Sequence, residues 1–192
     1  MKKKKTNSSR KPTTKNRSSK ASTNESDIIQ LILKDHMPLK KLIKILKDSD
    51  CKMSVKRPAF EKFAPMLLAH AKPEEESLYA RLKESDKELR TEGFEGETEH
   101  AIADELIEQI KQTQDEDNWM AKVKVLGELV EHHIEEEEGE MFRMVKKEFD
   151  IETRVAIGET YMSLKEKFEE ENMTEDMQPK TKKPKNEEQR YL

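Results

Sequence analysis

The sequence predicts an all-α protein, an up-down-up-down antiparallel four-helix bundle with an extra C-terminal helix and disordered tails. Two observations favour this class. Charged residues make up 41% of the 192 residues and there are only five glycines, a composition typical of helices rather than of sheets. Apolar side chains also recur every three or four residues along four segments joined by short polar connections, as expected for neighbouring antiparallel helices.

Composition divides the chain into a disordered basic arm, a helical bundle, a further helix and a disordered tail, at residues 1–26, 27–150, 151–170 and 171–192. Residues 1–24 hold nine Lys or Arg and no acid, and they lack the apolar surface that would offset the entropy of ordering. Removing these nine positive charges changes the formal net charge from −4 to −13. We expect the arm to stay solvated or to make a weak contact with nucleic acid or another anionic surface.

The single cysteine, Cys51, excludes an internal disulfide and fits a reducing compartment, so a cytoplasmic protein is expected. The basic start of the chain is followed by polar residues, which argues against a secretory signal peptide. No run of about 18 apolar residues occurs, so no transmembrane segment is expected. The helix at 151–170 either packs on the bundle or mediates self-association, and the oligomeric state stays open.

The first helix of the bundle is expected at residues 27–48. One stripe of side chains follows helical spacing: Ile29, Ile32, Leu33, His36, Leu39, Ile43 and Leu46. Asp27 is a suitable N-cap residue, because its side chain can accept hydrogen bonds from the free amides of the first turn. Pro38 lacks a backbone donor and should kink this helix near His36.

The second helix should begin near Pro58, a favoured first-turn residue, and end before Lys87. Its stripe consists of Phe60, Phe63, Leu67, His70, Glu74 and Leu78. Pro65 and Pro73 interrupt the pattern, so a kinked or bulged helix is expected rather than a straight one.

The third and fourth helices follow at about 97–114 and 118–148. Gly93 and Gly96 are expected to form the turn that precedes the third helix. The stripe of the fourth helix is Trp119, Val123, Leu126, Val130, His133, Glu137, Met141 and Met144. Histidine and glutamate residues on these apolar stripes are the anomaly that a functional site would explain.

Four of the five histidines form two matching pairs. The pattern His-x3-Glu-Glu occurs at His70 and again 63 residues later at His133, while His36 and His100 each follow an acidic residue and lie 64 positions apart. Residues four apart project from the same side of a helix, so each His-x3-Glu directs an imidazole and a carboxylate toward one point. The resulting set of six donors is His36, His70, Glu74, His100, His133 and Glu137.

A metal site is favoured over a merely polar core. A single His-x3-Glu arises easily by chance in an acidic chain, and an isolated histidine on an apolar stripe is more often a hydrogen-bonded core residue. A buried glutamate, however, is costly unless it is paired or bound to a metal. Mixed imidazole and carboxylate donors fit iron, manganese or zinc, and this number of donors suits two metal ions bridged by the carboxylates.

Over about residues 27–150 the chain resembles the hemerythrin-like family, the HHE cation-binding domain. The resemblance is carried by His36, by His70-x3-Glu74-Glu75, by Glu99-His100 and by the run Glu131–Phe142. It implies a four-helix bundle that holds two non-haem iron ions with an oxo or hydroxo bridge. It further implies bridging carboxylates at Glu74 and Glu137 and terminal ligands at His36, His70, His100 and His133.

The resemblance implies a protein that binds or senses oxygen, nitric oxide or oxidants. A di-iron enzyme that consumes peroxide or oxygen in oxidative-stress defence is the alternative, and the binding role is favoured. The small ligand would be a diatomic molecule or peroxide.

The chain departs from oxygen-carrying members of that family. Those proteins carry a second histidine four residues after the one in the third helix, and here this position is Asp104. Asp104 is taken as a seventh metal ligand, with a hydrogen bond to a ligand histidine or full solvation as the other possibilities. Glu75 and Glu138 are expected to lie outside the ligand set, although either could replace its neighbour. These departures argue against reversible oxygen carriage and leave the expected metal binding in place.

Overall fold

The computed structural model describes residues 25–176, so the predicted arm at 1–26 and tail at 171–192 lie outside this range except for residues 25–26 and 171–176. Residues 171–176 are helical, which contradicts the disorder predicted for them. Within the described range every regular element is helical and no strand occurs, as predicted. The α-helices are α2 (Ile28–Lys47), α3 (Met53–Glu74), α4 (Ala80–Lys83), α5 (Lys87–Gln112), α6 (Glu116–Glu136), α7 (Phe142–Glu148) and α8 (Ile151–Asp176). Two π-helical segments, η1 (Glu75–Tyr79) and η2 (Glu137–Met141), connect α3 to α4 and α6 to α7.

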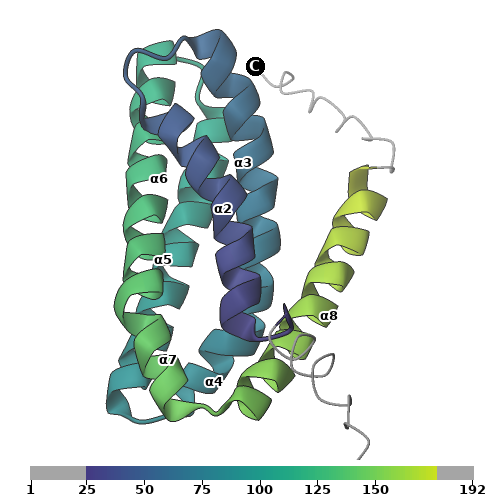
Figure 1. Ribbon diagram of the computed structural model, residues 1–192. Helices are drawn as coiled ribbons and strands as arrows, with labels where there is room; N and C mark the ends of the chain where they lie inside the picture. The colour runs from purple at the N-terminus through teal and green to yellow at the C-terminus, as the bar shows by residue number, and fades with distance from the viewer. Residues whose placement is uncertain (1–24, 177–192) are drawn as a thin grey trace, which may run out of the picture.

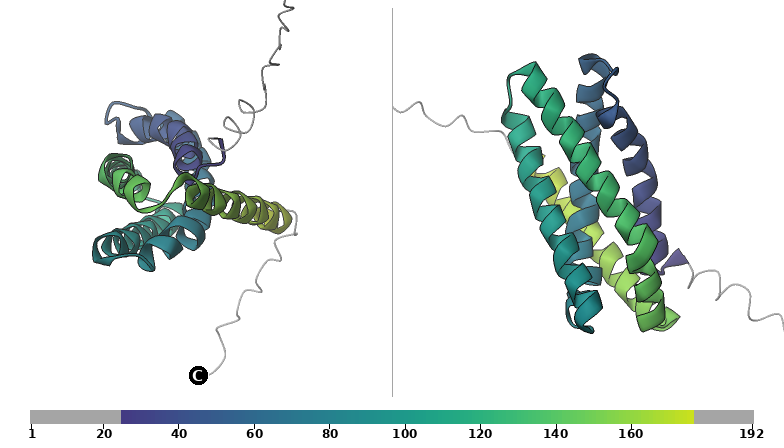
Figure 2. Two further views of the ribbon diagram at one scale, coloured as in Figure 1. Left: turned by 60° about the horizontal axis from the view of Figure 1, so that its bottom comes forward. Right: turned by 90° about the vertical axis from the view of Figure 1, so that its left-hand side faces the viewer.

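The bundle consists of four rods that lie side by side (Figures 1 and 2). Two rods are the single helices α2 and α5, and the other two are the continuous stretches α3–η1–α4 and α6–η2–α7. Short connections join consecutive rods, which favours contact between neighbours in the chain. The fifth long helix, α8, starts at the end of the bundle where α2 begins and packs on α2, α3 and η1 (Figure 1).

Aspartate side chains cap the starts of four helices, among them α8, where Asp150 accepts from the Thr153 amide at 2.8 Å. The Asp27 carboxylate accepts a hydrogen bond from the Ile29 amide at 3.1 Å, which confirms the predicted N-cap of α2. Asp86 and Asp115 do the same for α5 and α6. Each carboxylate satisfies amides that have no partner inside the helix and lies near the positive end of the helix dipole.

The second helix begins five residues before the predicted start, because α3 opens at Met53 and Pro58 lies in its second turn. The earlier start places Lys56 inside α3, where its buried ammonium group donates to the Leu46 carbonyl oxygen at 2.9 Å. That carbonyl belongs to the last turn of α2 and has no partner within its own helix. The predicted bulge is present as η1, which begins at Glu75, two residues after Pro73.

The prediction of a turn at Gly93 and Gly96 is wrong, because both glycines are buried inside α5. A Cβ atom on Gly96 would lie 2.6 Å from Cζ of Tyr79, and one on Gly93 would lie 3.0 Å from Cβ of Leu82. The two glycines therefore allow α5 to approach η1 and α4 closely. The third helix consequently starts at Lys87, ten residues earlier than expected.

Two apolar clusters fill the bundle and leave a polar layer between them. One contains residues from Leu39–Leu46 of α2 and their neighbours on α3, α5 and α6, and the other contains Ile28–Ile32 with side chains of η1, α4, α7 and α8. The four stripe histidines lie between these clusters along each rod. No helix in the described part of the chain is long and apolar enough to cross a membrane. The helix α8 extends to Asp176, beyond its expected end at residue 170.

Candidate metal centre

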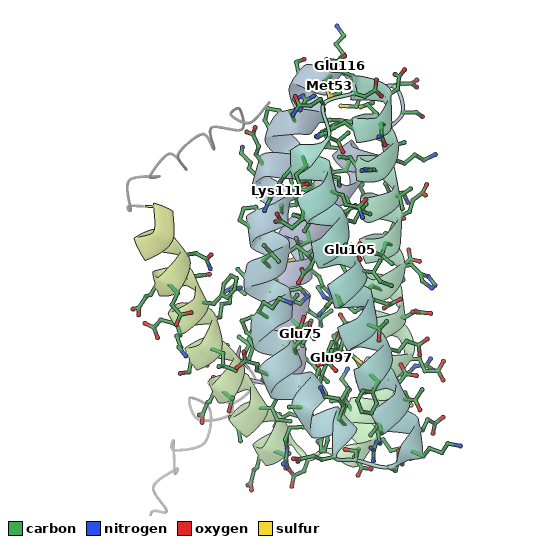
Figure 3. The ribbon with its side chains drawn as sticks, turned by 180° about the vertical axis from the view of Figure 1, so that it is seen from behind. Met53, Glu75, Glu97, Glu105, Lys111 and Glu116 are labelled. Carbon is green, nitrogen blue, oxygen red and sulfur yellow. The ribbon has the colours of Figure 1, made fainter. Side chains whose placement is uncertain are left out.

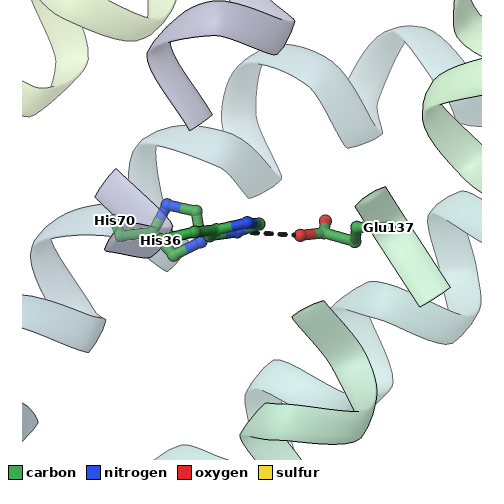
Figure 4. A group of neighbouring side chains, drawn as sticks. All are labelled: His36, His70 and Glu137. Carbon is green, nitrogen blue, oxygen red and sulfur yellow. Dashed lines mark ion pairs between the residues drawn. The ribbon is translucent and has the colours of Figure 1, made fainter. Parts of the chain in front are cut away.

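The structure brings the six predicted donors of the His and Glu repeat together in the polar layer. His36 comes from α2, His70 and Glu74 from α3, His100 from α5, His133 from α6 and Glu137 from the start of η2. Each of the six is buried. Donor atoms of His36, His70 and Glu137 lie within 4.8 Å of one another, as do those of His70, Glu74 and His100. Figure 4 shows the first group, with the His36 ring directed at the Glu137 carboxylate.

Each His-x3-Glu pair lies where an α-helix becomes a π-helix. Glu74 is the last residue of α3 and Glu137 the first of η2. Within the pairs, His70 Nε2 lies 3.3 Å from a Glu74 oxygen and His133 Nε2 lies 3.6 Å from a Glu137 oxygen. Short π-helical turns inside α-helices occur frequently at functional sites, and here both follow the carboxylates directly.

The outward nitrogen, Nδ1, of three site histidines contacts a carboxylate outside the centre. These contacts join His36 to Glu138 (2.9 Å), His133 to Glu99 (2.7 Å) and His100 to Glu75 (3.2 Å). An ionised carboxylate only accepts hydrogen bonds, so the hydrogen bonds of His36 and His133 place a ring proton on Nδ1, whereas the His100 contact is a close approach without hydrogen-bond geometry. Figure 3, which views the molecule from behind, shows Glu75 partway between the two ends of the bundle.

The fourth site histidine, His70, has a different outward partner. Its Nδ1 lies 3.2 Å from the hydroxyl oxygen of Tyr161 on α8, and this hydroxyl donates to the Asp35 carboxylate at 2.6 Å. Because the tyrosine proton is directed at Asp35, its oxygen accepts from His70 Nδ1. In all four rings Nδ1 therefore faces an outward partner and Nε2 faces the centre.

The atoms that face the centre are almost all acceptors. Nε2 of His100 lies 3.0 Å from Nε2 of His133, and Nε2 of His36 lies 3.1 Å from a Glu137 oxygen. Several of these buried atoms form no hydrogen bond with the described residues: Nε2 of His36 and His70, both Glu74 oxygens and one Glu137 oxygen. Buried acceptors without a donor are costly, whereas metal ions bind such atoms. The donor set therefore fits cations.

Burial and neighbouring charge perturb the protonation of this centre. Burial and the adjacent Glu137 raise the pKa of Glu74 well above its usual value. Burial, together with His36, lowers the pKa of His70 well below its usual value. Burial opposes ionisation of Glu137, but His133 and His36 outweigh it and hold the pKa of that carboxyl low. A raised pKa favours the protonated form of Glu74, and a cation that binds this carboxylate would displace the proton.

The seventh predicted ligand, Asp104, is not brought into the centre. Its carboxylate lies 2.5 Å from the Lys72 ammonium group, and its side chain is 28% exposed. Lys72 also contacts Glu75 at 3.1 Å, so Asp104 belongs to the ion pairs around the outward partner of His100. Glu138, the considered replacement for Glu137, is instead held by His36 and by Lys40.

Tyr79, which the predicted donor set does not include, also lies at the centre. Its buried hydroxyl donates to Glu137 Oε1 at 2.5 Å and lies 3.3 Å from Nε2 of His133. Its ring lies against Gly96, where any larger residue would clash. Gly93 and Gly96, which were predicted to form a turn, were the signal in the sequence that could have identified this contact.

A cavity of about 330 Å³ connects the surface between α5 and η2 with this part of the centre. Tyr79, His133 and Glu137 contribute to its lining. The rest of the lining is strongly acidic and contains Glu92, Glu95, Glu99, Glu135, Glu136 and Glu140. A cavity of this charge favours the approach of cations and small neutral molecules over that of anions.

Comparison with protein families gives one match that agrees with this geometry. The model of the hemerythrin HHE cation binding domain matches residues 27–145, well over half of the chain. Comparison with curated proteins and with solved structures gave no match. The matched range contains all six buried donors, together with the carboxylates that hold His36, His100 and His133 from outside. The chain therefore belongs to the hemerythrin HHE cation-binding domain family.

Proposed function

We propose that this protein holds two non-haem iron ions in the polar layer of its bundle. The ligands in this proposal are His36, His70, Glu74, His100, His133 and Glu137. One observation carries the proposal: where four imidazole rings and two carboxylates converge in a buried space, Nε2 of His36 and His70, both Glu74 oxygens and one Glu137 oxygen have no hydrogen-bond partner among the described residues. Two donor groups lie side by side in this layer, and although the single free nitrogen of His70 can serve only one ion, the two carboxylates can be shared, which supports two cations.

Iron is the cation that fits both the donors and the family. Imidazole and carboxylate suit iron as well as manganese and zinc, and no cysteine lies in the centre, since Cys51 is in the connection between α2 and α3. A pair of iron ions, when bound, supplies redox chemistry and coordination positions for a small ligand. The protein's own groups would fix the rings through their outward partners and exclude bulk water through the two apolar clusters.

The proposed role is to bind or sense oxygen, nitric oxide or another small oxidant. The cavity beside Tyr79 reaches His133 and Glu137, and its size admits a diatomic molecule or peroxide. The single cysteine continues to favour a reducing compartment such as the cytoplasm.

A second candidate is an enzyme that consumes peroxide or oxygen in oxidative-stress defence. The observation that favours it is the Tyr79 hydroxyl, which lines the same cavity and holds a proton 2.5 Å from Glu137 Oε1. Reduction of peroxide to two water molecules takes two electrons, which a ferrous pair would supply, and two protons, so a buried donor beside the access route would serve turnover.

One experiment tests the proposal and separates the two candidates. The purified full chain is loaded anaerobically with ferrous iron, its iron content is measured, and its optical spectrum is followed on exposure to oxygen and after degassing. About two iron ions per chain and a spectrum that returns on degassing support the binding role. Sustained consumption of added peroxide supports the enzyme. A chain that takes up no iron from ferrous solution refutes both candidates.

A further inference from the structure

The first half of α8 is attached to the bundle at several points. The Arg154 guanidinium group lies 3.0 Å from the Asp27 carboxylate that caps α2. Gly158 allows close approach of the two backbones, because a Cβ atom there would lie 2.0 Å from the carbonyl oxygen of Ser26. Tyr161 is 1% exposed and packs in the apolar cluster that includes Ile28–Ile32. The position of Tyr161 relative to the bundle is therefore well determined.

A polar chain leads from the surface of α8 to the metal centre. The Lys165 ammonium group pairs with the Asp35 carboxylate, which in turn accepts the Tyr161 hydroxyl proton at 2.6 Å. The Tyr161 oxygen lies 3.2 Å from His70 Nδ1. Since Asp35 only accepts, the direction of every bond in this chain is fixed, and His70 must carry its proton on Nδ1. The Nε2 lone pair of His70 is then available at the centre.

His70 differs from the other three site histidines in the origin of its outward partner. The partners of the other three are carboxylates that lie within residues 27–145, the range of the cation-binding domain. The partner of His70 is a hydroxyl from α8, 16 residues beyond the end of that range. His70 is also the residue common to both buried donor groups, so its orientation affects each of them.

We propose that Tyr161 is a positioning residue of the metal centre, which makes α8 a part of the cation site in this chain. By accepting from Nδ1, Tyr161 holds the His70 ring in the tautomer and orientation that present Nε2 to a cation. This inference rests on the proposed cation-binding function. It adds a required residue outside the family's domain.

Replacement of Tyr161 by phenylalanine isolates this role. The ring and its packing are kept, but the acceptor for His70 Nδ1 and the donor to Asp35 are both removed. The His70 proton is then buried without an acceptor, and the alternative tautomer with the proton on Nε2 becomes favourable. Loss of an outward partner of a metal-binding histidine typically weakens metal affinity by about 10- to 100-fold, and we expect this range here.

The test uses the full chain and Co²⁺ as the probe, because Co²⁺ accepts the same donors and reports its coordination in the visible spectrum. The affinity for Co²⁺ is measured by competition with a chelator for wild type, Tyr161→Phe and a control, Thr160→Val. Thr160 neighbours Tyr161 on an exposed face, and its hydroxyl donates only to the Ala156 carbonyl oxygen of the same helix. The ¹⁵N chemical shifts of the histidine rings in the metal-free protein report the tautomer of His70, assigned with His70→Gln.

The expected result is an Nδ1-protonated His70 in wild type and Thr160→Val. In Tyr161→Phe the tautomer should change and Co²⁺ affinity should fall 10- to 100-fold. An unchanged tautomer with unchanged affinity in Tyr161→Phe would overturn the proposal, as would an Nε2-protonated His70 in wild type. If wild type takes up no Co²⁺ or iron, the proposed function fails, and the tautomer of His70 still decides separately whether Tyr161 positions the ring.

Discussion

The Nε2 atoms of His100 and His133 lie 3.0 Å apart in the middle of the bundle. The Nδ1 atoms of both rings are directed at carboxylates, Glu75 and Glu99, which can only accept. Two lone pairs at this distance repel unless a proton or a cation lies between them. In agreement, burial opposes a charge on His133, but Glu137 and Glu99 outweigh it and raise its pKa. A proton therefore holds the metal-free centre together, and a cation would replace it.

His133→Ala should abolish uptake of cations at this centre, whereas His132→Ala should leave it intact. The two histidines are adjacent, but His133 is buried in the centre and the His132 side chain is 64% exposed. A cation at 100 times its dissociation constant stabilises a folded protein by about 2.7 kcal/mol. Thermal unfolding with and without ferrous iron should show this stabilisation for wild type and His132→Ala only. An equal response of His133→Ala would remove this residue from the ligand set.

Cation affinity should rise with pH because Glu74 must lose its proton. Burial and Glu137 raise the pKa of Glu74 in the folded chain above the ordinary 4.5. At pH values between 4.5 and this raised pKa, the folded chain therefore binds more protons than the unfolded chain. Through this window the Glu74 contribution to metal-free stability declines as pH rises, while cation affinity gains about tenfold per pH unit for each proton displaced. Chelator competition at several pH values measures the slope.

Glu74→Gln provides the control for this dependence, since glutamine has the shape of the protonated acid and releases no proton. The slope of the logarithm of cation affinity against pH counts the protons released on binding, and in this variant it should be lower by about one. The stability of the metal-free variant should also decline less through the same pH window. A variant with the wild-type slope would show that another group supplies the displaced proton.

Much of this site could be predicted from the sequence because helical geometry makes residue spacing equivalent to direction. Histidine and glutamate four positions apart must share a face, and His70 with Glu74 and His133 with Glu137 do so in the structure. The membership in a cation-binding family, inferred from the same residues, is confirmed by the family match. The all-α class followed from periodicity in the same way.

The remaining features depend on contacts between distant segments, which spacing does not encode. Tyr161 lies 91 positions from His70, and nothing in the apolar pattern of α8 indicated that it reaches the centre. Gly96 was misinterpreted because glycine serves both turns and close helix approach, and only the facing Tyr79 distinguishes the two. Asp104 occupies the expected face, but Lys72 on the neighbouring helix pairs with it.

Asp104→Asn should leave the number of bound cations unchanged. Its carboxylate pairs with Lys72 near the surface, so the substitution removes a partly exposed ion pair, which contributes at most about 1 kcal/mol. Calorimetric titration with Co²⁺ gives the stoichiometry, and Glu137→Gln is the matched comparison because it changes a buried donor by the same chemical step. Loss of one equivalent in Asp104→Asn would restore this residue as a ligand.

Gly96→Ala should destabilise the protein and displace Tyr79 from the centre, since the added Cβ would lie 2.6 Å from Cζ of that ring. Overpacking of this kind costs about 1–3 kcal/mol, measurable by urea unfolding. Gly139→Ala is the matched control, because no heavy atom lies within 4 Å of a Cβ there and glycine is itself unfavourable in a helix by about 0.5–1 kcal/mol. The control should therefore be neutral or more stable than wild type. If Gly96→Ala retained wild-type stability, α5 would have to move away from η1 without cost, and the close packing that places the Tyr79 hydroxyl on Glu137 would not depend on this glycine.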